Sequence, residues 1–153
     1  MNGTETGEVG LGKNGVTGII VPLDGGTIDR VFHHRPIIPI FVDRFPSDLE
    51  PGDRAFLYVS GGARVIDGEG GISSVTREPL SDVRLYAGEL CLSDNELDDY
   101  AASSRKTERD EMLVLKLDQP TKYVKAMKCS LKIPSDGVYM TSETFYHILS
   151  ENR

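Results

Sequence analysis

Tyr58, Ser60 and Glu69 are the side chains best placed in this sequence to form a single ligand site. A strand is expected over residues 54–60, and Glu69 lies between two glycines in the strand that follows. Glycines inside a strand indicate a bulge, a sharp bend or the close approach of a ligand. An aromatic ring, a hydroxyl and a carboxylate, with the bare backbone amide of Gly61, match what an unstacked nucleobase requires. Alternatively, Tyr58 belongs to the core and the glycines only bend the strand.

Phe41 and Arg44 are a second candidate pair, in a strand expected over residues 37–45. Alternate residues of a strand face the same side, so Phe41 shares a face with Asp43 while Arg44 points the other way. We expect Phe41, or else Tyr58, to stack a base, and Arg44 to hold a phosphate through its planar guanidinium. The alternative for Arg44 is an ordinary ion pair on the surface.

A row of lysines in the second half of the chain is the candidate for further phosphate binding. The row comprises Lys116, Lys122, Lys125, Lys128 and Lys132, and we predict phosphate contacts for Lys122, Lys125 and Lys128. The formal net charge of −7 and the pI of about 4.9 weigh against broad, non-specific binding to nucleic acid. A local basic face is compatible with an acidic chain, because net charge is a sum over the whole molecule. The alternative is that the lysines cover a solvated strand face.

The sequence favours no catalytic group, metal or cofactor. Cys91 and Cys129 form no Cys-x-x-Cys pattern and have no histidine at ligand spacing, so we expect two reduced, buried thiols. The segment 68–71 lacks the lysine and the following helix of a phosphate loop. No spacing joins a candidate nucleophile to a histidine.

Length and composition predict one folded domain. The chain has 153 residues, of which 39% are hydrophobic and 27% charged, as in ordinary globular proteins. Residues 1–15 hold five glycines and few apolar side chains, so we expect a flexible N-terminal segment before a single domain over 16–153. No apolar run approaches the roughly 20 residues that span a bilayer, and the first residues lack the features of a signal peptide. We therefore expect a cytoplasmic protein without membrane contact.

Short strands and helices must position these candidate residues. Strands are expected over 16–23, 37–45, 54–60, 64–75 and 111–118, with shorter pieces over 123–127 and 130–133, and helices over 28–33, 81–85, 93–103 and 142–149. Thr27 or Asp29 would cap the first helix. Ser93 and Glu96 form a capping box, and Thr141 would cap the last helix. Without βαβ alternation, the pattern predicts an α+β fold, a small, mainly antiparallel β-barrel with short helices packed at its ends.

Several short motifs, taken in order, give the chain a family resemblance. They are TGIIVP (17–22), RVF (30–32), IFVDR (40–44), PGD (51–53), FLYVS (56–60), GEG (68–70), LSDNELDDY (92–100) and YMT (139–141). With these motifs the chain resembles an uncharacterised, mostly archaeal family of PUA-like barrels, in a superfamily that includes PUA, ASCH, EVE and YTH domains. The resemblance covers most of the chain beyond residue 15 and implies a PUA-like fold. It also implies RNA or a modified nucleotide as the ligand, because members of the superfamily commonly bind these.

The resulting hypothesis is a non-catalytic module that binds RNA or a modified nucleotide, with Ser60, Gly61 and Glu69 reading the edge of the base. One alternative is a small ASCH-like hydrolase acting on a nucleoside-like substrate, with Glu69 or Asp43 as general acid or base. Another alternative is a protein-interaction module, which would present an apolar surface patch.

Overall fold

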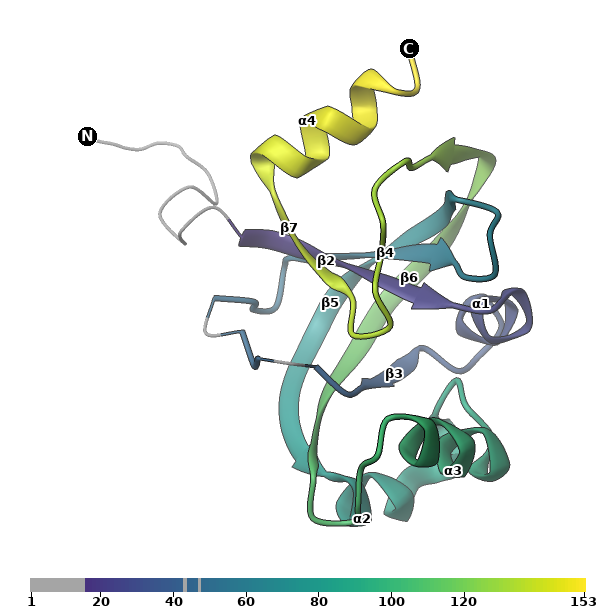
Figure 1. Ribbon diagram of the computed structural model, residues 1–153, viewed down its shortest axis with the longest axis vertical. Coiled ribbons are helices and arrows are strands. Elements are labelled where there is room, and N and C mark those ends of the chain that lie inside the picture. Colours follow the sequence, from purple (N-terminus) through teal and green to yellow (C-terminus); the bar gives the residue numbers. More distant parts are fainter. Residues whose placement is uncertain (1–15, 43, 47) are drawn as a thin grey trace.

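Residues 16–42, 44–46 and 48–153 are described by a computed structural model. The predicted flexible segment 1–15 lies outside the described residues, and so does Asp43, one of the two predicted acid/base residues. The described residues form an α+β fold, in which one six-stranded sheet carries four α-helices and a short 3-10 helix (Figure 1).

The sheet is mixed and mainly antiparallel, as the sequence predicted. Its strands are β2 (Val16–Leu23), β3 (Ile37–Ile40), β4 (Arg54–Val59), β5 (Val65–Pro79), β6 (Glu111–Lys128) and β7 (Val138–Thr141). They lie in the order β3-β6-β5-β4-β2-β7, and only the β2–β4 pairing is parallel. Among the described residues the edge strands β3 and β7 do not pair with each other, so closure of the sheet into the predicted barrel is not shown.

The helices occupy the ends and one side of the sheet. They are α1 (Gly25–Phe32), α2 (Leu80–Val83), the 3-10 helix η2 (Arg84–Glu89), α3 (Asp94–Ser103) and α4 (Ser142–Ser150). Figure 1 shows α2 and α3 at one end of the molecule and α4 at the opposite end. No helix within the described ranges is long and apolar enough to cross a membrane.

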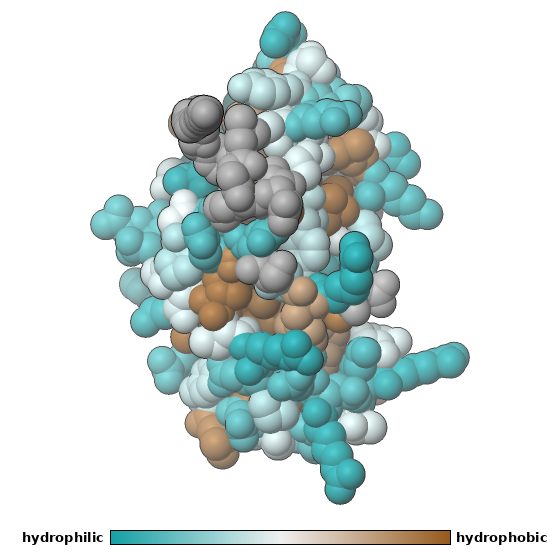
Figure 2. Space-filling model, turned by 90° about the vertical axis from the view of Figure 1, so that its left-hand side faces the viewer, coloured by the Kyte–Doolittle hydropathy of each residue, from teal (hydrophilic) through white to brown (hydrophobic). Residues whose placement is uncertain are grey.

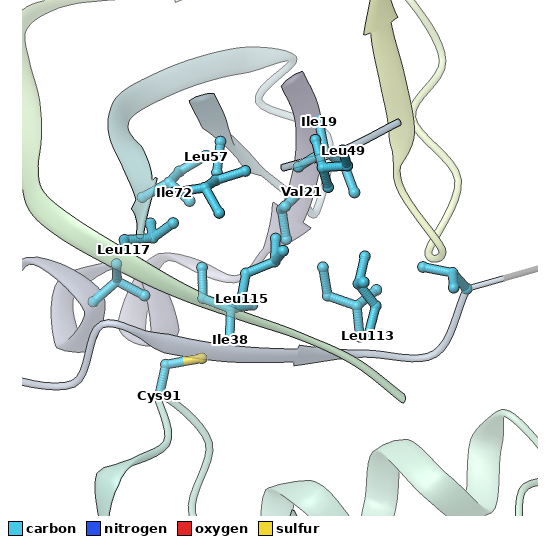
Figure 3. Packing of buried hydrophobic residues seen from close by; sticks show 14 of the residues in the cluster. Ile19, Val21, Ile38, Leu49, Leu57, Ile72, Cys91, Leu113, Leu115 and Leu117 are labelled. Atoms are coloured by element: carbon cyan, nitrogen blue, oxygen red, sulfur yellow. The ribbon is translucent and has the colours of Figure 1, made fainter. Parts of the chain in front are cut away.

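Strand β4 explains why both faces of the sheet are covered. Ala55 and Leu57 lie in one hydrophobic cluster, and Phe56 and Tyr58 lie in another. Successive side chains of a strand point to opposite faces, so a strand without polar alternation is buried on both sides. The sequence predicted this arrangement, and it is confirmed. Figure 3 shows how Leu57 packs in the first cluster, beside side chains from the neighbouring strands.

Strands β5 and β6 form a long, bent antiparallel pair, and glycine permits the bend. The register between them shifts at three places, two of which lie beside Gly68 and Gly71. A Cβ atom on Gly68 would come within 2.4 Å of Cζ of Phe32 and 2.5 Å of the carbonyl oxygen of Thr121. Gly68 therefore allows α1 and β6 to approach β5 closely, which confirms the expected bend at this glycine-rich segment.

The first helix starts earlier than predicted. Its N-cap is Asp24, whose side chain accepts a hydrogen bond from the backbone N–H of Thr27. The prediction of Thr27 or Asp29 as the cap was wrong, because Gly25 and Gly26 join the helix instead of forming a separate turn. The predicted caps Ser93 and Thr141 are confirmed for α3 and α4.

Three predicted strands have different limits. The strand predicted over 37–45 ends at Ile40, and the pieces predicted over 111–118 and 123–127 are one continuous strand, β6. The predicted strand over 130–133 is absent. Its first N–H, on Ser130, is bound by the carboxylate of Glu151 rather than by a neighbouring strand.

Candidate functional site

A cavity of about 330 Å3 lies where β2 ends and α1 begins. It is lined by Val21, Pro22, Leu23, Asp24, Thr27, Pro39, Ile40, Ser60, Leu92, Tyr100, Ile133 and Ser135. The parallel strands β2 and β4 both run toward it, since Leu23 pairs with Val59 and the N–H of Ser60 donates to the carbonyl of Leu23 over 2.9 Å. We call this space the first cavity. It lies at the carboxyl ends of two parallel strands, a frequent location for ligand sites.

The start of α1 supplies one wall of the first cavity. The Asp24 carboxylate accepts from the N–H of Thr27 over 2.8 Å, and the Asp24 carbonyl accepts from the N–H of Ile28 over 3.0 Å. The first amides of a helix have no partner within the helix and carry its positive dipole end. At Gly25 the space where a Cβ atom would lie is open. The helix start therefore contributes the Asp24 carboxylate and the Thr27 side chain to the lining of the first cavity.

Thr27 carries the one buried polar group of this wall that lacks a partner. The residue is only 1% exposed, and its hydroxyl oxygen makes no hydrogen bond within the described part of the chain. A buried polar group left unsatisfied costs about 1–3 kcal/mol. Because Thr27 lines the first cavity, a molecule bound there could satisfy this hydroxyl.

Tyr100 of α3 supplies a second polar group. Its hydroxyl oxygen accepts from the backbone N–H of Phe41 over 2.8 Å, and the centroids of the two rings are 4.9 Å apart. Burial raises the pKa of Tyr100 to about 12, so the phenol keeps its proton at neutral pH. Since the hydroxyl uses only its acceptor side for Phe41, its proton is available to a ligand.

An ion pair between Arg30 and Glu96 joins the two helices that carry Thr27 and Tyr100. The guanidinium binds both carboxylate oxygens of Glu96 and also donates to the carbonyl of Cys91 over 2.9 Å. The same carboxylate accepts from the N–H of Ser93 over 2.8 Å, which completes the capping box of α3. The Arg30 guanidinium and the capping bond lower the pKa of Glu96 to about 2. We call this the Arg30–Glu96 brace, and it holds α1 against the start of α3.

A second cavity, of about 610 Å3, adjoins the first. It is lined by Val42, Tyr100, Ser103, Ser104, Lys106, Ser135 and Asp136. Tyr100 and Ser135 line both spaces, so the two cavities lie side by side at these side chains. The first cavity is mainly apolar with four hydroxyl groups and one carboxylate, whereas the second is mainly polar and holds an ammonium group, Lys106.

The predicted ligand residues are distributed over several parts of the molecule. Ser60 lines the first cavity, and Gly61 follows it in the β4–β5 turn with a φ of +99°. Phe41 and Tyr58 are only 5% and 8% exposed, and they lie in two different hydrophobic clusters. Either ring would have to leave its hydrophobic cluster to stack a base, and stacking by Phe41 or Tyr58 stays a prediction.

Glu69 and Arg44 lie away from the first cavity's lining. Glu69 forms an ion pair with Arg54 and accepts from the hydroxyl of Tyr123 over 2.8 Å. It lines a separate space of about 220 Å3 with Thr17, Arg54, Phe56, Met140 and Phe145. Arg44 is exposed, and its carbonyl accepts from the hydroxyl of Tyr139 over 2.7 Å. Ligand contacts by Glu69 and Arg44 stay a prediction.

The three predicted phosphate-binding lysines are exposed on the second half of β6. The ammonium of Lys122 lies 3.8 Å from the carboxylate of Asp67. Lys125 and Lys128 line a further space of about 290 Å3 together with Ala126, Met127, Glu151, Asn152 and Arg153. Lys128 pairs with Val65, the first residue of β5, which follows Ser60 across the turn between β4 and β5.

Eight polar residues of the two cavities were missed by the sequence reasoning: Asp24, Thr27, Tyr100, Ser103, Ser104, Lys106, Ser135 and Asp136. A signal existed for the first two, because Asp24-Gly25-Gly26-Thr27 directly follows an apolar strand and opens a helix. Tyr100 follows Leu97 at helical spacing, which indicates a residue turned toward the protein interior. Ser135 carries no comparable signal.

The described residues offer little for metal or thiol chemistry. Cys91 and Cys129 are free and buried, as predicted, and burial raises the pKa of Cys91 to about 12. Across residues 16–42, 44–46 and 48–153, no group of three or more His, Cys, Asp or Glu side chains is arranged to hold a metal ion.

The apolar surface bears on the alternative of a protein-interaction module. Figure 2 shows hydrophobic residues in the middle of one side of the molecule, with hydrophilic residues around them. The large apolar side chains with most exposure are Leu85, Val124 and Tyr146, which belong to three different elements. Apolar side chains exposed singly are normal in a folded protein and do not define an interface.

Comparisons with known proteins identify the family and the fold. The family model described as "Domain of unknown function (DUF365)" matches residues 16–142. No curated protein matches the chain. The crystal structure of ASCH from Zymomonas mobilis is similar, with a TM-score of 0.65 and 14% identity over 88% of this chain and 94% of that chain. The N-terminal domain of Staphylothermus marinus McrB is similar with a TM-score of 0.57 and 12% identity, over 88% of this chain and 94% of that chain.

The serine-to-alanine variant of the same ASCH protein gives a TM-score of 0.67 at 12% identity, over 89% of this chain and 96% of that chain. At such low identity these matches establish the fold alone. They support the predicted likeness to ASCH and other PUA-like domains.

Proposed function

We propose that this chain, which belongs to the DUF365 family, is an RNA-binding module that takes one base into the first cavity. The ASCH-like fold favours nucleic acid as the class of ligand, and the site itself supplies the rest of the argument. Binding requires no covalent step, so the proposal assigns no catalytic residue.

The shape and chemistry of the first cavity suit a planar ring with a polar edge. Its volume of about 330 Å3 lies at the lower end of the range for small-molecule sites, about 300–1,000 Å3. Apolar side chains such as Leu23 and Ile40 can cover the faces of the ring. The hydroxyls of Thr27, Ser60 and Tyr100 and the carboxylate of Asp24 can hydrogen-bond its edge. Among the described residues no cation lines this space, so they would not stabilise an anionic group in it.

The observation that carries the proposal is the unsatisfied hydroxyl of Thr27. The substitution Thr27→Val removes the hydroxyl and nearly keeps the shape of the side chain. Without a ligand, the variant should be as stable as the wild type or slightly more stable, because an unpaired buried oxygen is lost. With a ligand, it should bind about 2–13-fold more weakly, the equivalent of a net hydrogen bond of about 0.5–1.5 kcal/mol.

The test is isothermal titration of both proteins with the four ribonucleosides and with five-nucleotide single-stranded RNAs, beside thermal unfolding of the free proteins. Thr76→Val is the matched control, since it makes the same change on β5 at a residue that lines none of the cavities described above. Equal affinity for wild type and Thr27→Val would contradict the assignment of the first cavity. Turnover of a nucleoside during titration would favour the ASCH-like hydrolase alternative instead.

Lys122, Lys125 and Lys128 are proposed to hold phosphates of neighbouring nucleotides in the bound RNA. Lys128 lies across the β4–β5 turn from Ser60, so an RNA strand that leaves the first cavity past Ser60 would reach these lysines. Each phosphate contact to single-stranded RNA steepens the dependence of log affinity on log salt by about 0.7. Replacing two of these lysines by alanine should therefore flatten the slope by about 1.4. An unchanged slope would remove the lysines from the site and leave the base contacts standing.

A further inference from the structure

We propose that the second cavity binds the ribose and the phosphate of the nucleotide whose base occupies the first cavity. The inference rests on the proposed function and extends it from a base to a ribonucleotide. Its starting point is that Tyr100 and Ser135 line both cavities, which places the second cavity directly beside the first.

Lys106 is the residue we assign to the phosphate. It is the cation among the side chains that line the second cavity, and it is exposed. Within the described part of the chain, its ammonium makes no salt bridge. The described lining of the first cavity holds no cation, so we place the phosphate of a nucleotide bound there by its base outside it. An ammonium group at the adjoining space provides the charge that a phosphate needs.

Asp136 is the residue we assign to the ribose. An ionised carboxylate only accepts hydrogen bonds, so it would repel a phosphate but can bind a sugar hydroxyl. The 2′-hydroxyl is the group by which a protein distinguishes RNA from DNA at a given site. The lining of the second cavity thus holds one group for each part of a ribose phosphate, with Asp136 on the sugar and Lys106 on the phosphate.

The backbone beside Asp136 keeps that carboxylate in place. The N–H of Gly137 donates to the carbonyl of Pro134 over 2.9 Å, which closes a tight turn around Asp136. Gly137 has a φ of +81°, and a Cβ atom there would lie 2.8 Å from the carbonyl oxygen of Ile20. The turn is therefore packed against β2 and has little freedom to swing away.

The experiment compares three kinds of probe on the wild-type protein by isothermal titration. The probes are the best-binding ribonucleoside, its 3′- and 5′-monophosphates, and the corresponding deoxyribonucleotides. We expect one of the two monophosphates to bind on the order of tenfold more tightly than the nucleoside, as one charge-assisted contact would give. We also expect the ribonucleotide to bind on the order of tenfold more tightly than the deoxyribonucleotide. A five-nucleotide RNA separates the two possible sources, since a free-nucleotide site would gain nothing from the longer strand.

Two substitutions assign these gains to residues. Lys106→Ala should abolish the gain from the phosphate and leave the affinity for the nucleoside unchanged. Asp136→Asn should reduce the preference for ribose. Lys116→Ala is the matched control, because it removes the same charge from an exposed position of β6 that lines none of the cavities described above.

The possible failures are distinct. If the nucleoside binds but the phosphate adds no affinity, or if Lys106→Ala keeps the full gain, the second cavity is not the ribose-phosphate site and the base site stands. If neither nucleosides nor nucleotides bind, the proposed function and this inference both fall.

Discussion

Removal of the Glu96 side chain should loosen the wall of the first cavity by a measurable amount. Glu96 closes the capping box of α3 and forms the Arg30–Glu96 brace that holds α3 against α1. Loss of the hydrogen bond from the N–H of Ser93 to the Glu96 carboxylate costs about 0.5–1.5 kcal/mol, and a partly exposed ion pair adds about 0.2–1 kcal/mol. We therefore expect Glu96→Ala to lower the free energy of unfolding by about 1.5 kcal/mol.

For a domain of this length, that loss corresponds to a fall in Tm of about 3–6 °C. Thermal unfolding followed by circular dichroism at pH 7 measures it directly. The matched control is Glu111→Ala, which removes a carboxylate from a more exposed ion pair with Arg77 and should cost no more than about 0.5 kcal/mol. If Glu96→Ala is no less stable than Glu111→Ala, the brace does not hold the two helices together.

The same residue gives a dependence on pH with a defined sign. The pKa of Glu96 falls from its ordinary value of 4.5 to about 2 in the folded protein. Protons therefore bind the unfolded chain more readily, so the stabilisation from Glu96 is complete above pH 4.5 and is lost as the pH falls toward 2. Over this window, wild type should lose more stability than Glu96→Gln, whose side chain does not titrate. Parallel curves of stability against pH for the two proteins would refute the assignment.

Two further substitutions test the fold around the site. Gly68→Ala should destabilise the protein by about 1–3 kcal/mol, because its Cβ atom would collide with the Phe32 ring and the Thr121 carbonyl. The control is Gly71→Ala, whose Cβ atom meets no atom within 4 Å and which should be nearly neutral. Urea unfolding measures both variants, and equal unfolding midpoints would contradict the packing argument. Thr141→Ala removes the cap of α4 and should lower the free energy of unfolding by about 1 kcal/mol, whereas Thr141→Ser should keep most of that stability. Thermal unfolding measures both variants, and equal Tm values for them would contradict the capping role.

The parts of this fold that depend on neighbouring residues could be predicted from the sequence. The capping box at Ser93 needs only residues three positions apart, and the burial of both faces of β4 follows from its unbroken apolar run. The extent of β6 could not be predicted from neighbouring residues, because the strand continues through Pro120 and through Gln119, which has a left-handed φ of +46°. Pairing with β5 on both sides of these residues keeps the strand continuous.

The candidate site depends on contacts between distant parts of the chain, which the sequence does not display. Phe41 looked available in a strand, but the backbone bond to Tyr100, 59 residues away, places it in the core beneath α3. Thr27 looked like a helix cap, but the earlier start of α1 turns its hydroxyl into a buried position without a partner. Such a group is recognised only once the residues around it are known.

The most direct test of the base site is a nuclear magnetic resonance titration of the 15N-labelled protein with its best-binding ribonucleoside. Our account predicts that the largest amide shifts will occur at the start of α1, at Gly25, Gly26 and Thr27, and at Ser60 and Ser135, in proportion to occupancy. Shifts confined to the space beside Glu69, or to that beside Lys125 and Lys128, would contradict the assignment of the first cavity as the site of the base.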